Sequence, residues 1–190
     1  MKDTPTLQSE RLLLRPLLPE DLDDVYEWTS SFTVTRYLWW HPNRDRSVTE
    51  KLLNKWIRQK RNYSWAVVKE KEVIGEVQVI KDLPNKGFEF GMISKESSWG
   101  HGYMKEAIFR AFEYCFEDAG YEYGYAESDS RNERSHHVLS VLGFKLVETK
   151  KDVLIEKKGE TIDVYCFRLT KQDFRNALGQ FKEAKRPYLS

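Results

Sequence analysis

The chain has 190 residues, 40% of them hydrophobic, and its 31 lysines and arginines nearly balance 30 aspartates and glutamates, which leaves a formal net charge of +1. This length and apolar share suit one domain with a substantial core, whereas a nucleic-acid-binding protein usually carries a strong basic excess. No apolar signal region begins the chain and no window approaches the roughly 20 apolar residues of a membrane span, so we expect neither a nucleic-acid nor a membrane partner. Cys115 and Cys166 lack metal-ligand or disulfide spacing, which predicts a cytoplasmic protein with Cys115 as a buried thiol.

The N-terminal third predicts one strand and two helices after a weakly organised stretch at 1–8. Residues 11–16 form a short apolar run that ends at a proline, which is typical of a strand. Pro19–Asp21 opens a first helix, and Ser47–Glu50 has the pattern of a capping box that starts a second one. The apolar faces of the two helices consist of Leu22, Val25 and Tyr26, and of Leu52, Leu53, Trp56 and Ile57.

The middle of the chain predicts a meander of three antiparallel strands. The strand patterns cover 63–68, 73–80 and 88–94, and the connectors between them are short and polar. A helix should follow from about Tyr103 to Ala119, because Gly120 is a natural helix stop.

The last third predicts two more helices and three more strands. A strand at 121–128 leads into a helix near 132–142, and an amphipathic helix begins near Lys171. Two strands, around 144–157 and 161–169, flank a turn between those helices. Strands and helices in this order favour an α+β, or mixed α/β, domain.

Gly100 and Gly102 stand between the strand at 88–94 and the helix that begins near Tyr103. Glycine tolerates positive φ and lets backbone N–H groups approach a ligand, and the first turn of a helix attracts anions. The segment is therefore either a phosphate cradle or simply a connector shaped for tight packing. It matches neither the Walker loop nor the Rossmann fingerprint.

Four segments stand in a suggestive order: Ser9–Pro16 with the acidic helix start after it, Phe88–Ile93, Trp99–Ala107, and Asn132–Ser135 with Leu142–Phe144 after it. Together they resemble the motifs of the GNAT superfamily of N-acetyltransferases, and more narrowly its branch of ribosomal-protein-alanine N-acetyltransferases. The resemblance implies a GNAT-like acyl-CoA acyltransferase fold, with a central, mostly antiparallel, twisted sheet flanked by helices. It also implies a single domain over 1–190, with a core over about 9–169 and a C-terminal helix over about 171–185.

The resemblance further implies acetyl-CoA as co-substrate and no metal. In the family, the loop before the helix binds the pyrophosphate through its backbone amides, and the strand before the loop pairs with the pantetheine arm. Met104 departs from this pattern, since it takes the place of a glycine or alanine. Carried over to this chain, the cofactor-binding residues are Met92, Ile93, Ser94, Trp99, Gly100, His101, Gly102, Tyr103, Met104, Asn132 and Ser135.

Three residues are candidates for the chemistry of acetyl transfer. Glu89 resembles the acidic residue of the family's fourth strand and is the first choice for a general base, while Glu76 is the second choice. Ser135 matches the serine that assists the departing thiolate. The alternatives are a solvent-facing strand residue for Glu89, and local backbone capping for Ser135. Asn132 is better suited to cap the helix or position pantetheine than to do chemistry.

Trp39, Trp40 and His41 lie between the two N-terminal helices, which wall the acceptor site in this superfamily. They either line an acceptor pocket or simply fill core, and the core interpretation is favoured. His136 and His137 are adjacent on a helix and point about 100° apart, so they do not serve one site.

The resemblance thus implies an acetyl-CoA-dependent N-acetyltransferase that acts by direct attack in a ternary complex. Its acceptor is a primary amine, either a small-molecule amine or a protein N-terminus, and a homodimer stays open because family members are often dimers. The alternative is a non-catalytic acyl-CoA-binding sensor or interaction module on the same fold. Convergence of Glu89 or Glu76 and of Ser135 on the cofactor's thioester would discriminate between the two, whereas carboxylates that point to solvent would favour the sensor.

Overall fold

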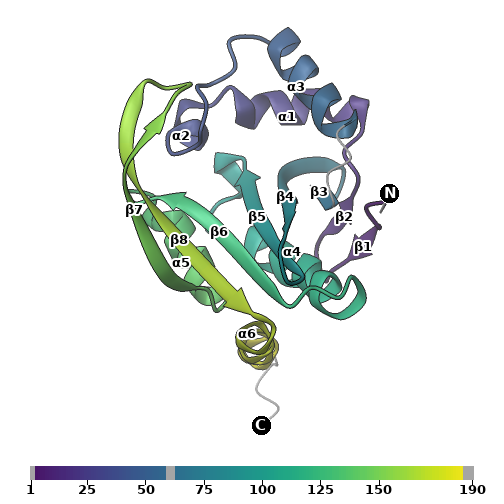
Figure 1. Ribbon diagram of the computed structural model, residues 1–190. Coiled ribbons are helices and arrows are strands. Elements are labelled where there is room, and N and C mark those ends of the chain that lie inside the picture. The colour runs from purple at the N-terminus through teal and green to yellow at the C-terminus, as the bar shows by residue number, and fades with distance from the viewer. Residues whose placement is uncertain (1–2, 59–62, 186–190) are drawn as a thin grey trace.

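The computed structural model describes residues 3–58 and 63–185. Within these residues one sheet has eight strands in the order β1-β2-β3-β4-β5-β6-β8-β7 (Figure 1). All neighbouring pairs are antiparallel except β5 and β6, which are parallel. The strands are β1 (Leu7–Gln8), β2 (Leu13–Arg15), β3 (Tyr63–Lys69), β4 (Glu72–Leu83), β5 (Gly87–Ser94), β6 (Tyr123–Asp129), β7 (Lys145–Ile155) and β8 (Glu160–Thr170).

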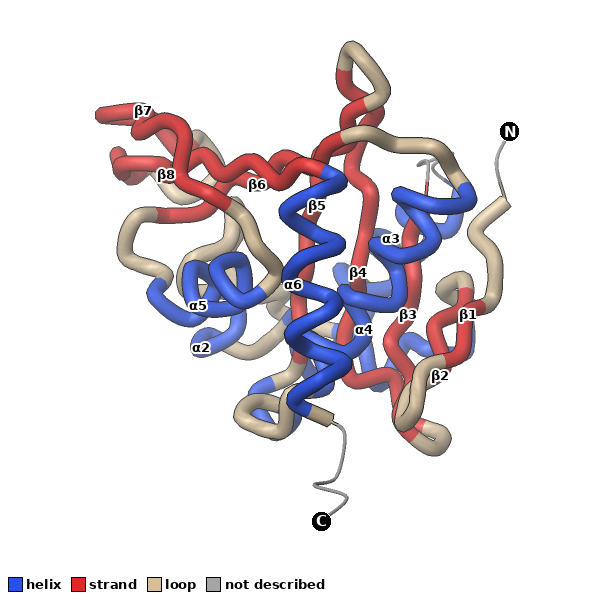
Figure 2. Tube along the Cα trace, turned by 90° about the horizontal axis from the view of Figure 1, so that it is seen from below, coloured by secondary structure: helices blue, strands red, loops and turns tan. Residues whose placement is uncertain are grey.

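Helices cover both faces of this sheet, as the resemblance implied (Figures 1 and 2). One face packs against α1 and α3 through a cluster that joins Trp28 and Trp56 to Ala66 and Ile93 of the sheet. The other face packs against α4, α5 and α6 in a larger cluster. The helices are α1 (Leu22–Thr29), α2 (Phe32–Thr35), α3 (Arg46–Arg58), α4 (Tyr103–Glu113), α5 (Glu133–Val141) and α6 (Lys171–Ala184).

Strand β5 divides its side chains between the two clusters, because successive residues of a strand point to opposite faces. Phe88 and Phe90 pack edge-on against Phe112 of α4, with ring centroids 5.1 and 4.9 Å apart. Ile93 instead belongs to the cluster of α1 and α3. Glu89 therefore lies on the same face of the sheet as Ile93, away from the aromatic core.

The parallel pair β5 and β6 separates part-way along its length. The two strands pair only from Gly87 with Tyr123 to Glu89 with Tyr125. Beyond that point β5 stays paired with β4 as far as Ser94, while β6 pairs with β8. The strands diverge visibly in Figure 1, so beyond Glu89 the edge of β5 toward β6 has no paired strand.

The structure corrects the predicted starts of the chain and of α3. Residues 1–8 are not all weakly organised, since Leu7–Gln8 form β1. The capping box at Ser47 is wrong, because α3 begins at Arg46 and the Asp45 carboxylate accepts a hydrogen bond from the backbone N–H of Val48. The Ser47 hydroxyl donates to Asp45 instead.

The helices differ from the sequence-based predictions in several places. Helix α2 was not predicted. In α1, Trp28 rather than Tyr26 shares the fully buried face with Val25, and Ile57 of α3 is exposed. The predicted helix at 103–119 is observed, but its last part, Tyr114–Asp118, is a π-helical turn before Gly120. Cys115 is buried, as expected.

Candidate active site

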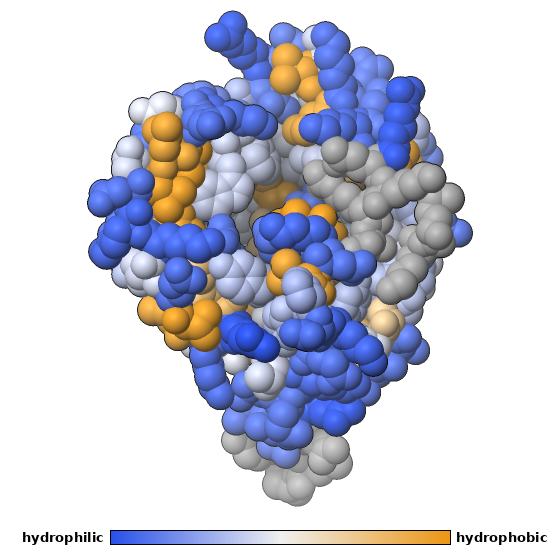
Figure 3. Space-filling view, in the orientation of Figure 1, coloured by the Kyte–Doolittle hydropathy of each residue, from blue (hydrophilic) through white to orange (hydrophobic). Residues whose placement is uncertain are grey.

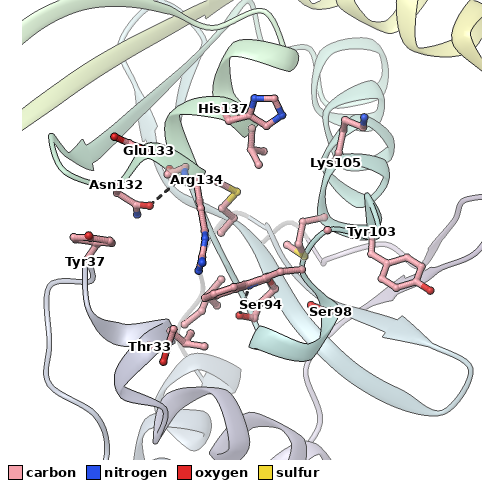
Figure 4. A pocket seen from close by; sticks show the side chains of 18 of the residues that line it. Thr33, Tyr37, Ser94, Ser98, Tyr103, Lys105, Asn132, Glu133, Arg134 and His137 are labelled. Atoms are coloured by element: carbon pink, nitrogen blue, oxygen red, sulfur yellow. Dashed lines mark hydrogen bonds between the residues drawn. The ribbon is translucent and has the colours of Figure 1, made fainter.

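A cleft of about 1040 Å³ borders the part of β5 that lies beyond its pairing with β6. Its walls are β5, the glycine turn before α4, the beginning of α5 and the region of α2, so segments from three parts of the chain converge on it (Figure 4). The surface is recessed near the centre of the view in Figure 3, between the strands on one side and the N-terminal helices on the other. Its volume lies just above the upper end of the roughly 300–1,000 Å³ range typical of small-molecule sites.

The glycine turn forms one end of the cleft. Gly100 and Gly102 have φ values of +77° and +74°, a conformation that L side chains rarely adopt. Gly102 is the N-cap of α4, so the helix points the N–H groups of its first turn toward the turn. These donors and the positive end of the helix dipole make this end of the cleft suitable for an anion.

Arg11 fastens the glycine turn to the N-terminal strands. Its backbone N–H and its Nε each donate to the Glu106 carboxylate, at 2.8 and 2.7 Å, and its Nη1 donates to the His101 carbonyl at 3.2 Å. The guanidinium also lies 4.7 Å from the ring centroid of Tyr103. Arg11 therefore connects the N-terminal strands to both the glycine turn and the first turn of α4.

Glu106, in the first turn of α4, is a buried charge that this arrangement satisfies. Burial alone would raise the pKa of its carboxyl, but hydrogen bonds from the Arg11 backbone, the Ser9 hydroxyl and the Arg11 side chain outweigh burial and lower that pKa. A negative charge in the first turn of a helix is further stabilised by the helix dipole.

The opposite wall of the cleft is the beginning of α5. Asn132 is the N-cap, and its Oδ1 accepts a hydrogen bond of 3.2 Å from the Ser135 N–H. Arg134 extends from α5 into the cleft (Figure 4). Its guanidinium lies 4.2 Å from the ring centroid of Trp99. The Trp99 indole N–H donates to the Ser94 hydroxyl at 3.0 Å. A cation therefore stands beside the glycine turn.

Most of the residues predicted to bind a cofactor line this cleft. Among the eleven, His101 alone is absent from its lining: its ring stacks on Tyr103 at 5.5 Å, while its carbonyl accepts from Arg11. Met104 lines the cleft although it departs from the family pattern.

A smaller cavity of about 150 Å³, the inner cavity, adjoins the cleft. Glu76, Glu89 and Ser135 all line it, so the three candidates for the chemistry converge. Six residues line both spaces and mark the boundary between them: Tyr37, Leu38, Met92, Ile93, Asn132 and Ser135.

The two carboxylates of the inner cavity have different surroundings. Glu76 is fully buried, and its Oε1 accepts a hydrogen bond of 2.5 Å from the Ser64 hydroxyl. Glu89 forms an ion pair of 2.7 Å with Lys81, and its side chain is 17% exposed. This pairing raises the pKa of Lys81, chiefly through the hydrogen bond to Glu89.

The three candidate acceptor-binding residues between α1 and α3 line two different spaces. Trp39 and Trp40 line the inner cavity, and each also packs against a hydrophobic cluster, so the pocket and core interpretations both describe them. His41 is exposed and lines a different space, the outer hollow, together with Phe32, Thr35, Arg36, Tyr37, Pro42, Arg131, Lys158 and Glu160.

The adjacent histidines serve different places, as expected. His136 Nε2 is 3.1 Å from the Asp129 carbonyl, and its ring packs against Tyr165 and Phe167. His137 is exposed and lines the cleft.

Sequence reasoning missed Glu127, which also lines the inner cavity. Burial acts to raise the pKa of Glu127, but Lys150, with its Nζ 2.6 Å from Oε1, and the hydroxyl of Tyr125, at 2.8 Å, lower the pKa overall. Alternation along β6 was the available signal, since it places Tyr125 and Glu127 on one face.

Two other properties concern the described residues as a whole. Across residues 3–58 and 63–185, no group of three or more His, Cys, Asp or Glu side chains is arranged to hold a metal ion. Over the same residues, no helix combines the length and the apolar character that crossing a membrane would need.

Comparison with known proteins identifies the family. The profile of the acetyltransferase (GNAT) domain matches residues 11–145, which include β2, both sides of the cleft and the inner cavity. The chain belongs to the GNAT acetyltransferase family. An uncharacterised N-acetyltransferase, p20, of Bacillus licheniformis is 31% identical over 176 residues, which cover 89% of this chain and 98% of that protein.

Solved structures confirm the GNAT fold. A GCN5-related N-acetyltransferase from Brucella melitensis superposes with a TM-score of 0.87 at 18% identity, covering 97% of this chain and 87% of that one. Spermidine N-acetyltransferase from Vibrio cholerae, solved with CoA and spermine, gives a TM-score of 0.74 at 23% identity, covering 87% of this chain and 99% of that one. The predicted mixed sheet flanked by helices is therefore correct.

Proposed function

We propose that this GNAT acetyltransferase transfers an acetyl group from acetyl-CoA to a primary amine by direct attack in a ternary complex. The observation that carries the proposal is the convergence of Glu76, Glu89 and Ser135 on the inner cavity, at the point where it adjoins the cleft. A protein that only sensed acyl-CoA would not need two carboxylates and a hydroxyl at this junction.

The cleft has features that fit acetyl-CoA. Gly100 leaves open space where a Cβ would stand, with no other heavy atom within 4 Å, so a pyrophosphate can approach the backbone closely. The guanidinium of Arg134 stands beside this turn. Past Glu89, the edge of β5 toward β6 is free to pair with an extended pantetheine arm as a strand would.

When bound, acetyl-CoA supplies the thioester carbonyl that the amine attacks. The attacking amine must be neutral, so Glu89 or Glu76 accepts a proton from the ammonium, directly or through water. A backbone N–H of β5 is suited to stabilise the oxyanion. The amine nitrogen forms the new C–N bond and negative charge develops on the carbonyl oxygen. When this oxyanion collapses, the C–S bond breaks, the nitrogen loses its second proton, and the thiolate, assisted by the Ser135 hydroxyl, gains a proton and leaves as CoA. No cysteine lines the cleft or the inner cavity among the described residues, so we propose no acyl-enzyme.

Two analogies suggest different classes of acceptor amine. The resemblance to the ribosomal-protein-alanine N-acetyltransferase branch suggests a protein N-terminus, whereas the structural similarity to a spermidine N-acetyltransferase suggests a small-molecule amine. We further propose that residues 1–190 act as a single cytoplasmic domain, and that a homodimer is the assembly to test for first.

The test is CoA release, measured with a thiol reagent while acetyl-CoA and a panel of small amines and N-terminal peptides are supplied. Turnover with one acceptor class supports the proposal. Glu89→Gln and Ser135→Ala should each lower kcat by about 100-fold, within the usual range for removing an acid or base. Acetyl-CoA binding without turnover of any acceptor would favour a sensor.

A further inference from the structure

We propose that the acceptor is a compact monoamine, in which a primary ammonium is carried by an aromatic or branched aliphatic body. This inference rests on the proposed acetyl transfer and concerns the inner cavity, which receives the acceptor. It excludes both protein N-termini and extended polyamines as preferred acceptors.

The size of the inner cavity limits what it can hold. Its volume of about 150 Å³ is half the lower bound of roughly 300 Å³ for typical small-molecule pockets. The much larger cleft beside it is the space that suits the cofactor. The acceptor therefore has only the smaller space for its reacting end and the body behind it.

The charges of the inner cavity favour one ammonium group. Glu76, Glu89 and Glu127 line it, and no lysine, arginine or histidine is among the described residues that do so. Two of these carboxylates are already paired with lysines, Glu89 with Lys81 on the adjacent β4 and Glu127 with Lys150 on β7. The cavity therefore attracts a cation but does not offer a row of uncompensated carboxylates, which several ammonium groups would require.

Most of the remaining residues that line the inner cavity are aromatic or aliphatic, while Gln78, Ser128, Asn132 and Ser135 add polar groups. Tyr37, Trp39, Trp40 and Trp56 contribute rings, and Leu38, Ile80, Phe90, Met92, Ile93 and Leu139 contribute further apolar surface. Aromatic faces attract ammonium ions and also gain from the burial of an apolar body. An extended peptide brings an N–H and a C=O with every residue, and the aromatic and aliphatic part of these walls offers those groups no partner.

The connector that carries Tyr37 and Trp39 is fastened at both ends, which disfavours a polypeptide acceptor. The Lys158 ammonium, from the turn between β7 and β8, donates to the carbonyls of Thr35 and Arg36 at 3.1 and 2.8 Å. At the other end, Asn43 donates from its backbone to the Thr29 carbonyl at 2.9 Å. A connector held in this way resists the displacement that would open a groove for a chain.

The experiment compares acceptors at saturating acetyl-CoA. We expect kcat/KM for 2-phenylethylamine to exceed that for spermidine and for an alanine-initiated tripeptide amide by about tenfold or more, a difference that pocket contacts commonly provide. Calorimetry with 2-phenylethylamine in the presence of CoA should detect binding independently of turnover. Trp39→Leu should raise KM for 2-phenylethylamine about tenfold while the affinity for acetyl-CoA stays unchanged.

Phe32→Leu is the matched control, because Phe32 begins α2, just before the connector, but is 72% exposed and lines the outer hollow. It should leave KM unchanged. Preferred turnover of spermidine or of the peptide would overturn this inference and leave acetyl transfer standing. An unchanged KM in Trp39→Leu would also overturn it. Failure to acetylate any amine would overturn the proposed function, and the inference with it.

Discussion

Arg11 and Glu106 are 95 residues apart in the chain, yet both the backbone N–H and the Nε of Arg11 donate to the Glu106 carboxylate. This contact joins the N-terminal strands to the first turn of α4, and through the His101 carbonyl it also reaches the glycine turn. The shape of the proposed pyrophosphate site therefore depends on a side chain outside the turn itself.

Arg11→Ala should both destabilise the protein and weaken acetyl-CoA binding. The loss of charge-assisted hydrogen bonds should lower the free energy of unfolding by about 1–2 kcal/mol, since the side chain of Arg11 is partly exposed. Arg110→Ala is the control, because Arg110 donates to the Gln8 carbonyl from α4 without touching the turn. If both variants bind acetyl-CoA equally well in calorimetry, Arg11 does not shape the site.

Glu106→Gln should remove part of the acid sensitivity of the fold. The folded-state pKa of Glu106 lies below its ordinary value of 4.5. The carboxylate therefore contributes stability that is full above that value and is lost as the pH falls through the folded pKa. Urea unfolding should show the largest difference between wild type and variant near neutral pH and a shrinking difference under acid. A difference that is constant with pH would contradict this assignment.

Comparing Gly100→Ala with Gly120→Ala should separate the cost of backbone strain from any obstruction of acetyl-CoA at the glycine turn. Gly100 and Gly120 have nearly the same φ, +77° and +76°, and an added Cβ meets nothing within 4 Å at either position. Each alanine variant should therefore lose about 1–2 kcal/mol of stability from the left-handed backbone alone. Acetyl-CoA affinity should fall only in Gly100→Ala. An equal fall in both variants would mean that the turn has no specific role.

Arg134→Ala should weaken acetyl-CoA binding, most strongly at low ionic strength, because the guanidinium over Trp99 stands beside the proposed phosphate site. Arg134→Lys should restore part of the affinity, since lysine keeps the charge but loses the planar stacking group. Arg168→Ala is the matched control. The Arg168 guanidinium lies 4.1 Å from the ring centroid of Tyr123, and neither residue lines the cleft. Calorimetry at two salt concentrations makes the comparison, and a salt-independent effect would argue against a phosphate contact.

Much of the fold could be predicted because local patterns decide it. The alternation of β5, the capping and stop residues of the long helix and the glycines before it all act within a few residues of each other. Helix α2 could not be predicted in the same way. Phe32–Thr35 has only four residues, and its stability depends on the Ser31 cap and on contacts from Lys158, far along the chain.

The candidate site shows the same division. Glu76, Glu89 and Ser135 could be proposed from sequence and resemblance, and they meet at the inner cavity. The roles of Glu127 and Arg11 could not be predicted, because each depends on a partner that only the fold brings near. Glu127 pairs with Lys150, and Arg11 pairs with Glu106. Asp45, and not Ser47, accepts the hydrogen bond from the backbone at the start of α3. Both residue types are common helix caps and they lie within one turn, so the sequence pattern does not say which one is used.

The most direct test of the account is mass spectrometry of a mixture of the protein, acetyl-CoA and 2-phenylethylamine. The account predicts that the acetyl group appears on the amine nitrogen, that the chain itself stays unmodified when acetyl-CoA is supplied alone, and that Ser135→Ala and Glu89→Gln slow product formation. Tight binding of acetyl-CoA with no acetylated product from this or any other amine would contradict catalysis, and an acetylated chain on the path to product would contradict direct transfer.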